Sequence, residues 1–126
     1  MFKGNKALGE ESERLAVNFL RKNGYEIICS DYTTKLGQID IIAKEQGFIC
    51  FIEVKSRSTN KFGLGSESVL PGKQRQISKA ALVFLKSNNL LGAKARFDVL
   101  SIDYSLNEGK FSLIKDAFEL QGGFIY

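Results

Sequence analysis

The sequence contains no histidine among its 126 residues. This absence excludes catalytic triads that rely on imidazole, zinc sites built on histidine, and nucleases that use a histidine general base. The metal ligands that remain are mainly hard oxygen donors, which favour Mg²⁺ or Mn²⁺. Any metal chemistry is therefore expected to depend on Asp and Glu.

Cysteines and long apolar runs are also scarce. The two cysteines, Cys29 and Cys50, lie in apolar, strand-like sequence. Two isolated cysteines in a small chain are typical of free thiols in a reducing compartment, although the sequence leaves a disulfide between them open. No run approaches the ~20 apolar residues that cross a bilayer, and residues 1–6 do not resemble a signal peptide. We therefore expect a cytoplasmic protein without membrane contact.

What the sequence does contain is a hairpin with charged residues inside apolar strands. Residues 37–43 and 47–55 are rich in β-branched and aromatic residues and are separated by the turn-forming pair Gln46 and Gly47. If that pair is a two-residue turn, counting outward places Asp40 directly opposite Glu53. Directly opposed residues have Cβ atoms roughly 4.5 to 5.5 Å apart.

Two carboxylates at that separation repel each other unless a positive charge lies between them, and a divalent cation is the usual solution. Lys55 follows Glu53 by two positions, so the alternation of a strand places it on the same face, about 6.6 Å further along. The hairpin is thus predicted to carry Asp, Glu and Lys on one face. The alternative is a structural salt bridge at a sheet edge, in which Lys55 neutralises one carboxylate.

The spacing of Asp40, Glu53 and Lys55 resembles the core of the PD-(D/E)XK nucleases, and the chain as a whole resembles the YraN family. YraN proteins are bacterial and are similar to archaeal Holliday-junction resolvases. The segments that carry the resemblance are Glu13-x-x-Ala16 with Phe19-Leu20, Asn23-Gly24-Tyr25, residues 37–43, residues 51–57, Phe62-Gly63, Val69, Lys73 and residues 96–99. The resemblance implies the restriction-endonuclease-like fold, an α/β architecture with a mixed central sheet.

The resemblance also implies roles for individual residues. Asp40 and Glu53, with the carbonyl of Val54, would bind Mg²⁺ or Mn²⁺, and Glu13 would complete or support the site. Lys55 would orient or activate the attacking water and offset negative charge on the phosphate.

One residue departs from the family. Gln38 stands where the family typically has Glu, so an auxiliary acid at that position is absent.

Helical spacing singles out Glu13 independently. Residues 10–23 carry an apolar stripe at helical spacing that ends at Asn23-Gly24. At about 100° per residue, Glu13 lies at the margin of that stripe, whereas Glu10 and Glu11 point away. We expect only Glu13 to face the sheet, either as a supporting carboxylate or as a surface glutamate whose stem covers apolar residues.

The net charge of +4 is unevenly distributed. Residues 35–79 hold eight Lys or Arg against four Asp or Glu, whereas the rest of the chain is balanced. A basic segment around an acidic pocket is expected of a protein that holds a polyanion such as DNA. The candidate phosphate contacts are Arg57, Lys61, Lys73, Arg75 and Lys79. The same residues are equally compatible with an ordinary solvated surface.

The remaining elements complete an αβββαββ order in a single domain, residues 1–126. A strand is expected at residues 25–33, a helix that begins at Pro71, and strands at residues 96–104 and 110–118. The order predicts a mixed sheet with a helix on each face. Phe62, in the long loop over residues 56–70, is a candidate for stacking on a base or for anchoring the loop. The apolar tail, residues 122–126, is expected to dock on the core or on a second subunit.

These observations favour a metal-dependent endonuclease acting on branched or structured DNA, and the analogy with resolvases implies a two-fold homodimer. Two alternative functions belong to other classes of protein. A nucleic-acid-binding module without hydrolysis is favoured by Gln38. An interaction subunit of DNA-processing machinery would use the apolar tail.

Overall fold

The computed structural model describes residues 2–57, 69–104 and 110–120, without the side chains of residues 2–8 and 57. The elements in chain order are α1 (Phe2–Lys22), β1 (Glu26–Thr33), β2 (Gln38–Glu45), β3 (Phe48–Arg57), α2 (Pro71–Ser87), β4 (Ala95–Asp103) and β5 (Lys110–Phe118). This αβββαββ order confirms the sequence prediction.

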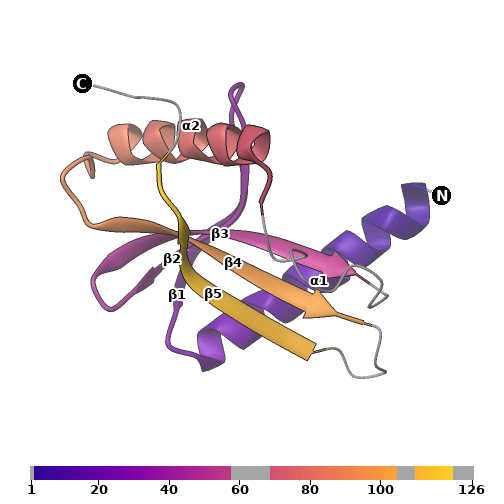
Figure 1. The fold of residues 1–126 in the computed structure, drawn as a ribbon. Coiled ribbons are helices and arrows are strands. Elements are labelled where there is room, and N and C mark those ends of the chain that lie inside the picture. Colours follow the sequence, from indigo (N-terminus) through magenta and orange to yellow (C-terminus); the bar gives the residue numbers. More distant parts are fainter. Residues whose placement is uncertain (1, 58–68, 105–109, 121–126) are drawn as a thin grey trace.

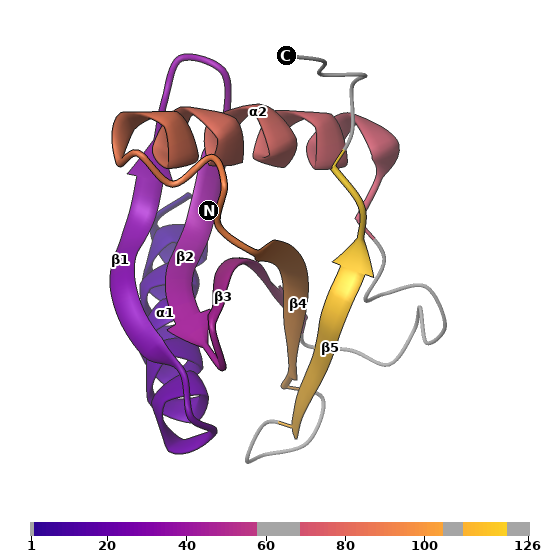
Figure 2. The same cartoon turned by 90° about the vertical axis from the view of Figure 1, so that its left-hand side faces the viewer.

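The five strands form one mixed sheet in the order β1-β2-β3-β4-β5. Strands β3 and β4 are parallel, and every other neighbouring pair is antiparallel. Parallel neighbours require a crossover connection, and here the crossover contains α2. The helix α2 lies across one face of the sheet and α1 across the other (Figure 1 and Figure 2). The predicted mixed sheet with a helix on each face is therefore confirmed.

The core consists of two apolar clusters, one on each face of the sheet. The cluster beneath α2 contains Ile39, Ile42, Ile49, Phe51, Val69, Ile77, Ala80, Ala81, Phe84, Leu85, Phe97 and Val99. The cluster beneath α1 contains Ala16, Leu20, Tyr25, Ile41, Ala43, Cys50, Ile52, Leu100 and Ile102. Strands covered on both faces have no polar alternation, which explains the continuous apolar runs in the sequence.

The two helices differ in how closely they match the prediction. Pro71 occupies the start of α2, as predicted, and the apolar residues that this helix buries are Ile77, Ala80, Ala81, Phe84 and Leu85. In contrast, α1 begins at Phe2 instead of near residue 10. The apolar stripe marks only the part of a helix that packs on the core, so it could not indicate the first turns of α1.

A buried cluster of charges joins the far end of β2 to β4 and β5. Arg96 donates to Glu45 Oε1 at 2.7 Å and to Asp98 Oδ1 at 2.9 Å. The Tyr25 hydroxyl donates to Asp98 Oδ2 at 2.9 Å, and Lys115 Nζ lies 3.1 Å from Glu45 Oε2. Because each buried carboxylate has charged partners, the cluster avoids the cost of an unpaired buried charge and has a structural role.

Cys29 and Cys50 are free thiols, as expected. No helix in residues 2–57, 69–104 or 110–120 is both long and apolar enough to span a membrane. The predictions for Lys61, Phe62 and the tail fall on residues outside the described part of the chain.

Candidate active site

The ladder of paired residues between β2 and β3 ends next to Asp40. Its pairs run from Glu45 opposite Phe48 to Ile41 opposite Ile52, which is the register that the turn predicted. The next position in that register would pair Asp40 with Glu53. There the Val54 N–H donates instead to Asp40 Oδ2 at 2.8 Å. The Asp40 side chain thus takes over hydrogen bonding at the point where the backbone ladder stops.

The two predicted carboxylates approach each other from different sides of the sheet. Ile39 and Ile42 both belong to the cluster beneath α2, so the alternation of β2 is broken at Asp40. Asp40 lines a cavity on the α1 side, whereas Lys73 Nζ of α2 lies 3.8 Å from Glu53 Oε2. The charge of Asp40 nevertheless acts on Glu53, so the two carboxylates are close. The prediction that Asp40 and Glu53 share one face of the sheet is therefore wrong. The two residues approach each other from opposite faces.

Burial raises the proton affinity of both carboxylates of this pair. Burial is the main cause that raises the pKa of Glu53 to about 7, and the charge of Asp40 adds to it. The charges of Lys73 and Lys55 oppose that rise. Burial also raises the pKa of Asp40, although the hydrogen bond from Val54 acts in the opposite direction. The pair thus favours a bound positive charge, whether a proton or a cation.

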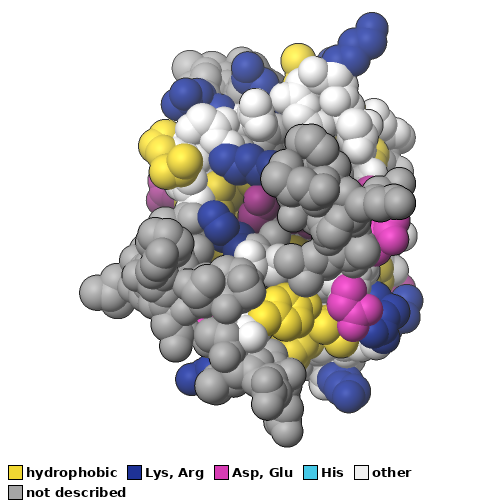
Figure 3. All heavy atoms as spheres, turned by 90° about the vertical axis from the view of Figure 1, so that its right-hand side faces the viewer, with side chains coloured by type: hydrophobic (Ala, Val, Ile, Leu, Met, Phe, Trp, Pro, Cys, Tyr) yellow, Lys and Arg dark blue, Asp and Glu magenta, His cyan; other side chains and the backbone are white. Residues whose placement is uncertain are grey.

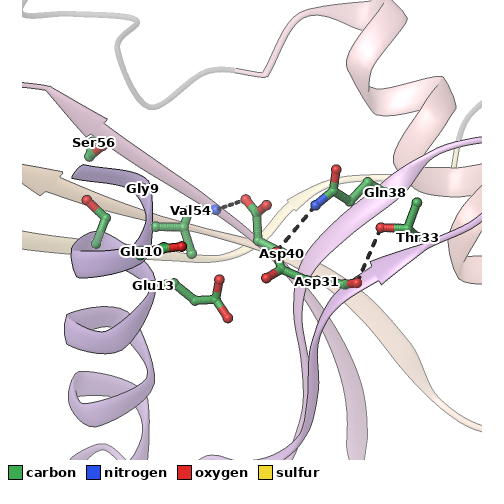
Figure 4. Close-up of a pocket in the computed structure, with 10 residues that line it drawn as sticks. Gly9, Glu10, Glu13, Asp31, Thr33, Gln38, Asp40, Val54 and Ser56 are labelled. Carbon is green, nitrogen blue, oxygen red and sulfur yellow. Dashed lines mark hydrogen bonds between the residues drawn. The ribbon is translucent and has the colours of Figure 1, made fainter. Parts of the chain in front are cut away.

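Glu13 reaches this site from α1. Its carboxylate lies near Ser30 and Asp31 of β1, and burial raises its pKa, with further contributions from the charges of Asp31 and Asp40. Figure 4 shows Glu13 directed from the helix toward Asp31 and Asp40. The expectation that Glu13 faces the sheet is met. Glu10 lines the same cavity, contrary to expectation, because the cavity opens beside α1 and not beneath its apolar stripe.

The cavity has a volume of about 550 Å³. Its lining comes from α1, β1, β2 and β3 and consists of Gly9, Glu10, Ser12, Glu13, Asp31, Thr33, Gln38, Asp40, Val54 and Ser56. Carboxylates from three different elements therefore share one solvent-accessible space.

Asp31 is the site residue that the sequence analysis missed. The β1–β2 register pairs Ser30 with Ile41 and Tyr32 with Ile39, which places Asp31 opposite Asp40. Asp31 has a φ of 53°, in the left-handed region that Asp tolerates better than most residues. The Gln38 amide donates to Asp31 Oδ1 at 3.3 Å (Figure 4). Gln38 therefore holds a neighbouring carboxylate in place.

The position of Asp31 follows from the turn between β1 and β2, which the sequence analysis did not identify. The turn at residues 34–37 is closed by a hydrogen bond from Thr34 N–H to the Gly37 carbonyl at 2.8 Å, and Thr33 pairs with Gln38. Counting outward from that pair, as for the hairpin that follows, places Asp31 opposite Asp40.

The predicted basic residues divide into three groups. Lys55 and Lys73 are half-buried, and both charges act on Glu53. Arg75 and Lys79 are exposed on α2. Lys61 and the side chain of Arg57 lie outside the described part of the chain.

The donor set determines which cofactor could bind. Within the described residues, no three His, Cys, Asp or Glu side chains converge closely enough to hold one metal ion. Mg²⁺ is usually held by one or two carboxylates and keeps several waters. Asp40 and Glu53 supply two adjacent carboxylates, and burial is the main cause that raises the pKa of each. These residues fit a hard divalent cation better than a closed, all-protein metal site.

Comparison with known proteins identifies the family. The profile described as "Uncharacterised protein family UPF0102" matches residues 12–102. The chain belongs to the UPF0102 family. That family, also called YraN, is the one that the sequence motifs resemble. The matched region contains Glu13, Asp31, Asp40, Glu53 and Lys55.

Several UPF0102 proteins are similar to this chain over most of their length. The UPF0102 protein of Caldicellulosiruptor bescii is 50% identical over 90% of this chain and 98% of its own. The one from Geotalea uraniireducens is 47% identical over 92% of each chain. The one from Desulfosudis oleivorans is 42% identical over 88% of this chain and 89% of its own.

Proposed function

We propose that this UPF0102 protein is a metal-dependent endonuclease that hydrolyses phosphodiester bonds in branched or otherwise structured DNA. The observation that carries the proposal is the meeting of Asp40 and Glu53 where β2 and β3 part, with both pKa values raised. The strand order and the resemblance to PD-(D/E)XK nucleases support assigning the restriction-endonuclease-like fold.

In this proposal, Asp40 and Glu53 hold Mg²⁺ or Mn²⁺ together with the carbonyl of Val54. Such an ion polarises the phosphate and makes a bound water more acidic. Glu13 supports the site from α1, where it lies near Ser30 of β1. Asp31 lies across the same cavity and adds negative charge that favours cation binding.

Lys55 and Lys73 would have different roles. Lys55 is on β3, two residues after Glu53, and its charge acts on that carboxylate. This position suits a residue that orients the attacking water and offsets charge on the phosphate. Lys73 is paired with Glu53 at 3.8 Å, so we infer that it releases Glu53 when a cation binds and then contacts the substrate.

The distribution of charge supports an anionic substrate. Figure 3 shows an acidic side chain at the floor of a recess with Lys and Arg side chains on its rim. Lys73, Arg75 and Lys79 of α2, with Arg57 and Lys61, would contact phosphates around the site. The preference for branched DNA and a two-fold homodimer rest on the analogy with resolvases.

Two observations favour a second function, in which the protein binds DNA without hydrolysing it. Within the described residues, no group of three metal-ligating side chains is assembled, and Gln38 contributes an amide where the family typically has a carboxylate. A protein with the same fold and basic residues could bind structured DNA without cutting it.

A cleavage assay separates these functions. Duplex, single-stranded, flap and four-way DNA would each be incubated with Mg²⁺, Mn²⁺ or chelator, using the native chain and the variants Asp40→Asn, Glu53→Gln and Lys55→Met. We expect metal-dependent cleavage that all three variants abolish and that Glu13→Gln reduces less. Binding without cleavage in either metal would support the binding module instead, and no DNA binding would contradict both functions.

A further inference from the structure

A second cavity lies away from the carboxylates, between the second half of α2, the start of β4 and the end of β5. Its volume is about 510 Å³. Its apolar walls include Leu82 and Leu85 of α2, Leu91, Phe97, Phe118 and Leu120. We call this cavity the α2–β5 groove.

The α2–β5 groove has an aromatic floor and an exposed apolar rim. The rings of Phe97 and Phe118 are 4.9 Å apart, and Phe51 lies 5.6 Å from Phe97. On the rim, Leu91 and Leu120 are 52% and 43% exposed. Arg96, Asp116 and Glu119 also line the groove, but most of its lining is apolar, as is typical of a binding pocket.

The C-terminal segment of the chain starts at the rim of the α2–β5 groove. Leu120 lines the groove, and the six following residues are Gln121, Gly122, Gly123, Phe124, Ile125 and Tyr126. This segment contains no charged side chain, and its last three residues are apolar. The two glycines allow the sharp change of direction that a return to the groove requires. Six residues reach up to about 20 Å, which is ample for a groove that starts at Leu120.

We propose that Phe124, Ile125 and Tyr126 dock in the α2–β5 groove of their own chain. The short connection favours this occupant over a second copy, because a short linker holds a segment near its site at an effective concentration in the millimolar range. Docking covers Leu91 and Leu120 and links the end of β5 to α2. This inference is independent of the proposed nuclease activity.

Disulfide trapping tests the docked arrangement. Leu91→Cys and Ile125→Cys would be combined in a chain that also carries Cys29→Ala. Cys50 can remain because its thiol is fully buried and its pKa is raised to about 12. Under a mild oxidant, we expect a bond between the two introduced thiols within one chain, since a disulfide requires Cα atoms no more than about 7 Å apart. Non-reducing mass analysis distinguishes this product from a covalent dimer.

The matched control keeps both introduced thiols and adds Phe124→Ser and Tyr126→Ser. Because the reach of the segment is unchanged, only docking should differ, and we expect trapping to slow by about tenfold as the local concentration falls. Equal rates in the two chains, or no intrachain bond in either, would overturn the proposal. A disulfide that forms between two chains would also overturn it and would identify a second copy as the occupant.

A measurement without cysteine substitutions provides a second test. A chain with Ser at positions 124–126 should bind more of a hydrophobic fluorescent dye than the native chain, because the α2–β5 groove is then uncovered. Unchanged dye binding would contradict docking in the native chain.

Discussion

At the scale of single residues, Asp40 combines two interactions that can be separated by mutation. Its Oδ2 accepts the Val54 N–H, and its charge repels Glu53. Asp40→Asn keeps an acceptor oxygen and removes the charge. We expect the metal-free protein to gain on the order of 1 kcal/mol of unfolding free energy, the upper range of cross-strand pair effects. Stabilisation by Mg²⁺ should be lost, and thermal melts in chelator and in excess Mg²⁺ measure both effects.

Asp116→Asn is a suitable control for that substitution. Asp116 is exposed on β5 and lines the other cavity, so its neutralisation should not change the response to Mg²⁺. The structural salt bridge predicts a different result for Asp40→Asn, because loss of one partner would leave the lysine uncompensated. A destabilised metal-free variant, with no effect of metal on the native chain, would contradict the proposed site.

The pKa of Glu53 predicts how stability depends on pH. Its folded value of about 7 lies above the ordinary value of 4.5, so the folded protein binds this proton more tightly than the unfolded chain does. Protonation therefore favours folding, and the stability of the metal-free protein should fall as pH rises from about 4.5 to about 7. Urea denaturation midpoints across that range, in chelator, measure the slope.

Glu53→Gln provides the comparison, because it removes the titrating group and should flatten this part of the pH profile. Excess Mg²⁺ should also reduce the slope in the native chain, since a cation binds the ionised carboxylate. A native profile that rises over the same range would show that Glu53 is ionised in the folded protein at lower pH.

Strand register made some positions of single residues predictable and left others unpredictable. The Gln46–Gly47 turn was sufficient to align Asp40 with Glu53, because a two-residue turn leaves no freedom in the pairing. The break in alternation at Asp40 was not predictable in the same way. Sequence periodicity assumes a regular strand, whereas Asp31, opposite Asp40 on the neighbouring strand, has a φ of 53°.

At the scale of elements, the β1–β2 turn is packed directly against α2. A Cβ added to Gly37 would clash with the Gln76 carbonyl oxygen of α2. Gly37→Ala should therefore displace backbone and cost roughly 1 to 3 kcal/mol of stability, as other overpacked contacts do. Chemical denaturation measures this loss.

Gly92→Ala is the matched substitution. No atom lies within 4 Å of the Cβ that it would add, so its effect should be small. If the two variants were equally stable, the close contact between the turn and α2 would be wrong.

The elements were predictable where sequence periodicity reflects packing. The stripe of α2 and the strands β2 and β3 are covered by neighbouring elements, so their apolar spacing marks them. The first turns of α1 carry no such stripe. Glu45 was also missed as a buried residue, because its partners Arg96 and Lys115 belong to strands that are distant in the sequence.

At the scale of the whole molecule, the excess positive charge predicts how DNA binding responds to salt. Removing one side chain that binds a phosphate should reduce the slope of log K against log salt by roughly 0.9 on duplex DNA, because fewer counterions are released. We expect Arg57→Ala, Lys73→Ala and Arg75→Ala each to weaken binding and flatten this slope. Fluorescence anisotropy at a series of salt concentrations measures affinity and slope together.

Lys44→Ala controls for net charge in that experiment. Lys44 is an exposed residue near the opposite end of β2 from Asp40, so its removal should leave the slope nearly unchanged. Equal effects of Lys44→Ala and the three other substitutions would indicate nonspecific attraction to a positively charged molecule. No effect of any substitution would contradict the proposed basic surface.

The hydrogen bond between Val54 and Asp40 also provides a spectroscopic reporter. An amide proton donated to a carboxylate resonates at a frequency that depends on whether that carboxylate is ionised. The Val54 signal in an NMR spectrum would therefore follow the charge state of Asp40 directly, without DNA and without turnover. A titration with Mg²⁺ that shifts this signal before those of distant amides would locate cation binding at one atom of one side chain.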